Sequence, residues 1–238
     1  MTEPPTVLVP VEILTGEVVP DTLIEVLAPV PVVLLGYHEI PDQTPPAQAR
    51  QQFGERAEEL LADLAERLEA QGGTVETQVV FTADPDETIE RVATDLDRVA
   101  VLLINPSPQI EQVLVAVRGG INVEAIGSMV AAIVEETAIA VTLYHATEDG
   151  TPDEEAIEAI EGIEARLEAA GVDPENLHRQ VEETDEPLYG LIELANEHDL
   201  LVMGEDRPKI TDKLFGETSE RVADRSVVPV LVVRRPNT

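Results

Sequence analysis

Short runs of apolar residues alternate along the chain with segments of helical periodicity. Such runs are typical of strands that are buried on both faces of a parallel sheet. Strands are expected at residues 7–11, 30–37, 75–81, 99–104, 113–117, 141–144, 177–183, 199–204 and 228–233. Helices are expected at residues 18–28, 46–70, 86–95, 153–171 and 187–198. Strands and helices that alternate at this spacing predict right-handed βαβ units and an α/β fold.

The pattern restarts near the middle of the chain. Val-Leu-Val at residues 7–9 recurs at residues 113–115, an offset of 106, and Tyr37-His38 matches Tyr144-His145. We therefore predict two tandem Rossmann-like or flavodoxin-like domains with parallel sheets, at residues 1–109 and 110–238. Between Pro108 and the second repeat there is no room for a final helix and strand, so the first domain is predicted to lack its last strand.

Residues 199–235 contain the clearest candidate for a ligand site. An apolar strand ends at Gly204, a polar loop follows, Gly216 opens a short helix, and a final apolar strand comes last. A glycine at the end of a strand lets the backbone approach a ligand, and the N-terminus of a helix favours anions. This order predicts a nucleotide-binding corner, which belongs to the second domain because the first has no equivalent.

In this order, the strand of residues 113–117, the Gly204 and Gly216 segments and the last strand resemble the universal stress protein family. The resemblance covers residues 110–235, and residues 6–108 resemble a truncated copy. It implies an adenine-nucleotide-hydrolase-like fold and a homodimer formed through the last strand. It also implies an ATP loop of the form Gly-x-x-Gly, nine residues, Gly-Ser/Thr. ATP-binding members have an aspartate at the end of strand one and hold adenine around strand two.

The residues that this resemblance assigns to nucleotide binding lie at the ends of strands one and four, in strand two and in the loop. They are Val117, Arg118, Val141, Gly204, Arg207, Gly216, Thr218 and Ser219. Arg207 replaces the second glycine, the loop is one residue short, and Glu217 replaces the serine or threonine. A carboxylate at Glu217 repels phosphate, and Arg118 cannot accept a hydrogen bond from a ribose as aspartate does. The ATP motif is therefore expected to be degenerate.

Residues 207–225 are unusually basic for this chain. They hold five of its fifteen cationic side chains, including both lysines. The five are Arg207, Lys209, Lys213, Arg221 and Arg225. One interpretation is a remodelled site for a small anionic ligand, such as a nucleotide or a phosphate. The other is internal pairing with neighbouring carboxylates.

The chain carries 48 acidic and 15 basic residues, a formal net charge of −33. This charge excludes the positive surface that nucleic acids and anionic membranes require. An acid excess with only two lysines is typical of a halophilic protein that stays hydrated in concentrated salt. With no cysteine, no secretory leader and no membrane-spanning segment, we expect a cytoplasmic protein without membrane insertion.

Other patterns give no sign of catalysis or of a metal. The four histidines lack metal-ligand spacing, and there is no Walker loop. His38 and His145, expected just past strand two of each repeat, form either a proton-sensitive site or a structural position inherited by duplication. We predict a non-enzymatic binding and regulatory protein of the stress response, without a required cofactor, whose first domain completes a pseudo-dimer or covers the second. The alternatives are an adenine-nucleotide binder or slow ATPase, and a regulatory subunit of a membrane transporter.

Overall fold

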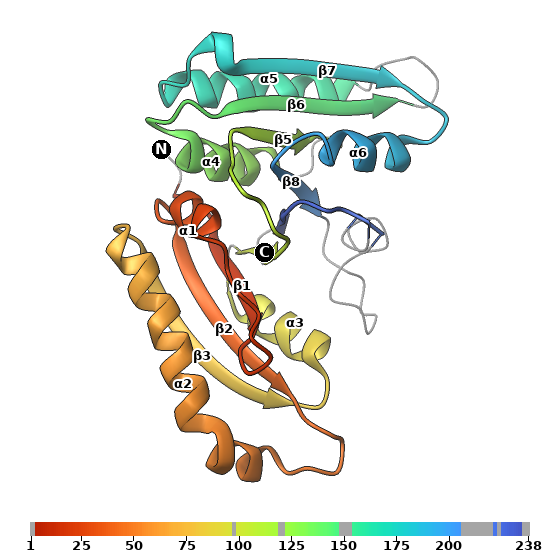
Figure 1. Cartoon of the computed structure of the whole chain (residues 1–238). Helices are drawn as coiled ribbons and strands as arrows, with labels where there is room; N and C mark the ends of the chain where they lie inside the picture. The colour runs from red at the N-terminus through yellow and green to blue at the C-terminus, as the bar shows by residue number, and fades with distance from the viewer. Residues whose placement is uncertain are drawn as a thin grey trace.

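The structure is a computed structural model, and it describes residues 3–96, 99–118, 122–147, 154–205, 221–222 and 225–234. Its strands are β1 (Thr6–Glu12), β2 (Pro31–Glu39), β3 (Thr74–Thr82), β4 (Val99–Leu103), β5 (Gln112–Ala116), β6 (Ala140–Thr147), β7 (Leu177–Glu183), β8 (Leu200–Glu205) and β9 (Val230–Arg234). Its α-helices are α1 (Asp21–Leu27), α2 (Pro46–Ala70), α3 (Pro85–Asp95), α4 (Val123–Val134), α5 (Glu154–Ala169) and α6 (Pro187–Ala195). The mixed α/β class predicted from the sequence is confirmed (Figure 1).

The local signals in the sequence correspond to elements in the structure. The helix expected at residues 46–70 is α2, with the same bounds. Asp84 caps α3 by accepting a hydrogen bond from Glu87 N at 2.9 Å, and Pro85 occupies the first helical turn. Helix α4 was not among the predicted helices.

All nine described strands form a single sheet with the order β3-β2-β1-β4-β9-β8-β5-β6-β7. Pairing is parallel within β1–β4 and within β5–β9, and antiparallel where β4 meets β9. The sequence predicted two tandem domains with parallel sheets. In the structure the two parallel parts share one sheet, because β9 pairs with the edge of β4 (Figure 1).

Strand β9 is therefore hydrogen-bonded on both sides. Val232 is the register partner of Val101 in β4 and of Met203 in β8. The expectation that the last strand offers an edge to a second copy of the chain is wrong for this structure, because no side of β9 remains for another strand.

Helices cover both faces of the sheet. Apolar side chains of α1, α2, α4 and α5 form one hydrophobic core with one face, and those of α3 and α6 form a second core with the other. Val113, Leu114 and Val115 of β5 are fully buried in consequence. This double burial explains why the strand reads as an uninterrupted apolar run.

Candidate ligand-binding site

The carboxyl ends of β5 and β8 lie side by side where the order of the strands reverses. From β5 the chain moves outward to β6 and β7, and it then returns to the other side of β5 to form β8 and β9. In open α/β sheets, ligands bind in the crevice outside the carboxyl ends of the strands at such a reversal. The candidate site is therefore this edge of the sheet, which we call the β5–β8 edge.

Three residues form a row across β8, β5 and β6 at the β5–β8 edge. Continuing the two strand registers by one residue places Gly204, Val117 and His145 next to one another. The Val117 amide donates to Tyr144 O at 2.8 Å, and the Val117 carbonyl lies 3.0 Å from His145 Nδ1. Val117 and His145 are buried, whereas Gly204 contributes no side chain. A ligand at this edge meets the backbone of β8 directly.

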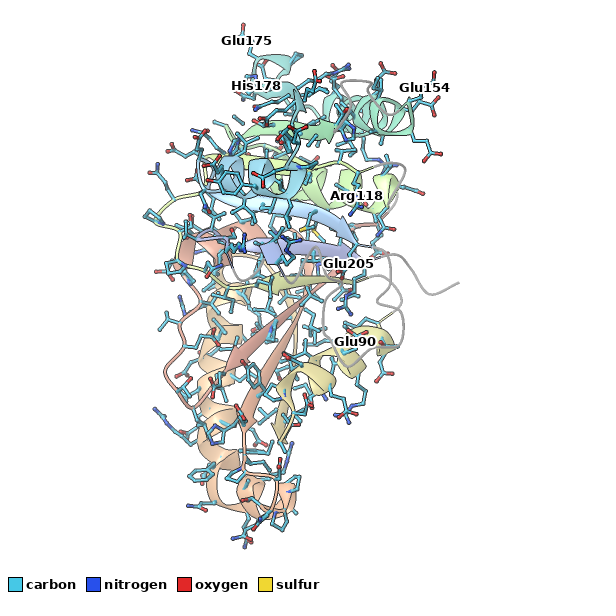
Figure 2. All side chains as sticks on the ribbon, turned by 90° about the vertical axis from the view of Figure 1, so that its right-hand side faces the viewer. Glu90, Arg118, Glu154, Glu175, His178 and Glu205 are labelled. Carbon is cyan, nitrogen blue, oxygen red and sulfur yellow. The ribbon has the colours of Figure 1, made fainter. Side chains whose placement is uncertain are left out.

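Arg118 follows this row and is exposed. Figure 2 shows Arg118, Glu205 and Glu90 on the same side of the molecule. Where ATP-binding relatives are expected to carry a carboxylate, this chain thus places a guanidinium, which donates hydrogen bonds and accepts none. The side chain favours anionic over hydroxyl-rich groups.

Buried charges lie at the carboxyl ends of β8 and β9. Glu205 and Arg234 are register partners and are 6% and 5% exposed. Arg234 Nη1 donates to Glu90 Oε2 of α3 at 2.7 Å, and Arg234 Nε lies 3.9 Å from Glu205 Oε2. This Glu90–Arg234–Glu205 network joins the first half of the chain to the candidate site. Sequence reasoning missed it, because Glu90 and Arg234 are 144 residues apart and no local pattern relates them.

Asn122 connects the start of α4 to the ends of β8 and β9. Its backbone is left-handed, with φ of 54°, a conformation that asparagine tolerates better than most residues. Its Nδ2 donates to Glu205 O at 3.2 Å and to Val233 O at 3.0 Å, so the side chain does not cap the helix. An asparagine just before an apolar helical segment was the available signal, and it was not used.

The structure brings some of the predicted site residues together and leaves others apart. Val117, Arg118 and Gly204 lie at the β5–β8 edge. Val141 is fully buried near the start of β6, opposite Val113, so it lies in the core away from that edge. The remaining predicted residues, Arg207, Gly216, Thr218 and Ser219, lie outside the described residues.

All three tyrosines of the chain have a raised pKa, and for two of them, one in each half, burial is the main cause. Burial, with a smaller effect of Glu17 and Glu12, raises the pKa of Tyr37 to about 12. Burial and a 2.9 Å hydrogen bond to Glu182 raise the pKa of Tyr144 above its ordinary value. Both phenols therefore stay neutral at physiological pH. Glu182 therefore has a structural hydrogen bond.

Within the described part of the chain, no three or more histidine or carboxylate side chains are grouped to hold a metal. In the same residues, no helix is long and apolar enough to cross a bilayer. His38 and His145 lie inside β2 and β6, not past their ends as expected.

Comparison with known proteins places this geometry in a family. No curated protein matches the chain. A universal stress protein from Archaeoglobus fulgidus is similar over 99% of this chain and 98% of its own, with 19% identity and a TM-score of 0.68. A functionally unknown protein from Pseudomonas aeruginosa covers 98% of this chain and 92% of its own, with 19% identity and a TM-score of 0.52. At these identities the similarity shows the fold. The universal stress protein family model matches residues 110–234, more than half of the 238 residues, and the chain therefore belongs to the universal stress protein family.

Proposed function

We propose that the second half of the chain binds an adenine nucleoside or mononucleotide at the β5–β8 edge and acts through this binding, without catalysis. The observation that carries the proposal is the row of Gly204, Val117 and His145 at the point where the strand order reverses. Membership of the family supports an adenine-containing ligand, because the resemblance implies adenine nucleotides for its ligand-binding members.

Triphosphates are expected to bind more weakly than the nucleoside. Glu205 places a buried carboxylate directly after Gly204. At about 4 Å, two like charges repel by about 1 kcal/mol in water and by about 4 kcal/mol near a protein surface. Arg234, whose Nε lies 3.9 Å from Glu205 Oε2, and the exposed Arg118 oppose this repulsion. Because the repulsion grows with the number of phosphate charges, a single phosphate is expected to be tolerated better than three.

We also infer that the chain is a fused pair of universal-stress-type units, with a first unit that lacks its last strand. In support, the strand order β3-β2-β1-β4 of the first half recurs as β7-β6-β5-β8 in the second. The pairing of β4 with β9 then provides, within one chain, the kind of edge contact that the resemblance implies between two copies.

Calorimetry and thermal unfolding with adenosine, AMP, ADP and ATP test the ligand. The titrations use molar KCl, where a chain of formal net charge −33 is strongly screened. At a hundredfold excess over Kd, a ligand adds about 2.7 kcal/mol to the free energy of unfolding. We expect adenosine or AMP to give the largest stabilisation. Stabilisation by none of the four contradicts the proposal.

A further inference from the structure

His145 has one ring nitrogen with a partner and one without. The side chain is 6% exposed, and its Nδ1 lies 3.0 Å from the Val117 carbonyl oxygen. Its Nε2 is buried and has no hydrogen-bond partner. Buried polar atoms in folded proteins nearly always have a partner, so each exception needs a specific explanation.

The bond to Val117 fixes which nitrogen carries the proton. A carbonyl oxygen only accepts hydrogen bonds, so Nδ1 must be the donor. In the neutral ring, Nε2 then carries the lone pair and accepts hydrogen bonds. The orphaned atom is therefore an acceptor, and its missing partner is an N–H or O–H group.

His145 lies on the same face of the sheet as Gly204 at the β5–β8 edge. Val113, Val115 and Val117 of the β5 segment, with Val202 of β8, face the core under α4 and α5. Because side chains alternate along a strand, Gly204 and His145 lie on this same face. Gly204 has no side chain, and it lies two strands away from His145 in this row. The space above Gly204 is therefore on the same face of the sheet as the unpaired Nε2 of His145.

We propose that His145 Nε2 accepts a hydrogen bond from a donor group of the ligand bound at the β5–β8 edge. The inference rests on the proposed function and narrows it: the ligand presents an N–H or O–H donor, which is the amino group of the base or the 2′- or 3′-hydroxyl of the ribose. His145 is then a specificity-determining residue, because a ligand without that donor leaves the buried acceptor unpaired.

The equivalent histidine of the first half provides the control. His38 follows Tyr37 as His145 follows Tyr144, but its ring lies against Phe53 and Phe81, with centroids 5.9 and 6.1 Å away. Its Nδ1 is buried without a partner, so the contact that orients His145 on Val117 has no counterpart there. A change at His38 alters a similar ring without touching the β5–β8 edge.

The test uses His145→Asn, because the asparagine Nδ2 takes the place of histidine Nδ1 and retains the donor to Val117 while Nε2 is lost. His38→Asn is the matched control. Each protein is titrated with adenosine, purine riboside, 2′-deoxyadenosine and 3′-deoxyadenosine by calorimetry in molar KCl. We expect His145→Asn to weaken adenosine about fivefold, the effect of one neutral hydrogen bond, and His38→Asn to leave it unchanged. The analogue that lacks the recognised donor should bind wild type and His145→Asn equally.

Two results overturn the inference while the proposed function stands: adenosine binding equally well to His145→Asn and wild type, or all four ligands weakened by one common factor. A wild type that binds none of the four instead contradicts the proposed function, and the inference falls with it. Nitrogen-15 spectra of labelled histidine give a check that does not depend on folding of a variant. Nε2 should resonate as an unprotonated nitrogen and shift when adenosine saturates the protein. An unchanged resonance at saturation also overturns the inference.

Discussion

Removing the carboxylate of Glu90 is expected to destabilise the protein by about 2 kcal/mol, because it removes a 2.7 Å charged hydrogen bond from the buried guanidinium of Arg234. Breaking a fully buried ion pair costs about 3–5 kcal/mol. The cost here is smaller for two reasons. The Glu90 side chain is 30% exposed, and Glu205 remains 3.9 Å from Arg234. The loss should therefore be closer to that of one hydrogen bond to a charged group, which contributes about 1.5–3 kcal/mol.

Urea unfolding of Glu90→Ala, followed by circular dichroism because the chain has no tryptophan, measures this loss. The slope with urea should stay unchanged, so the midpoint alone reports the effect. Glu87→Ala, an exposed position on the same helix, is the control. In molar KCl, screening over about 3 Å removes the contribution of an exposed charge and leaves that of a buried one.

A double-mutant cycle with Arg234→Met isolates the pair. After Arg234 is removed, Glu90→Ala should cost at least ~1 kcal/mol less than in the wild type. The reason is that the free-energy changes of mutations at two contacting residues deviate from additivity by roughly 0.5–3 kcal/mol. The reasoning is refuted if Glu90→Ala costs no more than Glu87→Ala, or if the two changes add within about 0.5 kcal/mol.

Two further predictions test other parts of the structure. Val101→Cys with Val232→Cys, the only thiols in a chain without cysteine, should form an intrachain disulfide at any dilution, because these residues face each other across β4 and β9. Disulfide-linked dimers of either single variant, seen by mass spectrometry without reductant, would contradict this internal pairing. Because the folded pKa of Tyr37 is about 12 and the unfolded value is near 10, the unfolded state loses its proton first. The free energy of unfolding should therefore be unaffected by Tyr37 below pH ~10 and fall as the pH rises towards ~12. Tyr37→Phe should lessen this fall. An equal fall in the variant would show that groups other than Tyr37 cause it.

Local patterns predicted most of the elements, because strands that are buried on both faces and amphipathic helices each leave a periodic signal. Helix α4 lacks that signal. Its residues Ala125, Ile126, Met129 and Val130 are all buried, as are Gly127 and Ser128 between them. Covered by the sheet, α1 and α5, this helix presents almost no polar face, and its sequence reads as one apolar stretch.

The register of the strands and the partners of β9 could not be read from the sequence. The repeated Val-Leu-Val motif equates Glu12 with Arg118. In the sheet, however, Tyr37 faces Glu12 whereas Tyr144 faces Ala116. The motif recurs, but the pairing shifts by two residues, because hydrogen-bond register depends on the connections and not on the motif alone. The antiparallel contact of β4 with β9 likewise depends on which edges remain uncovered after folding.

The direction of β9 also explains how the first half affects a site that it does not form. Because β4 runs antiparallel to β9, the carboxyl ends of β1–β4 lie at the opposite end of the sheet from Gly204. The amino end of β4 and the preceding helix α3 lie beside the end of β9 instead. Glu90 therefore reaches Arg234 from α3, whereas the strand ends of the first half face away. The first half can thus support the β5–β8 edge without adding a second copy of it.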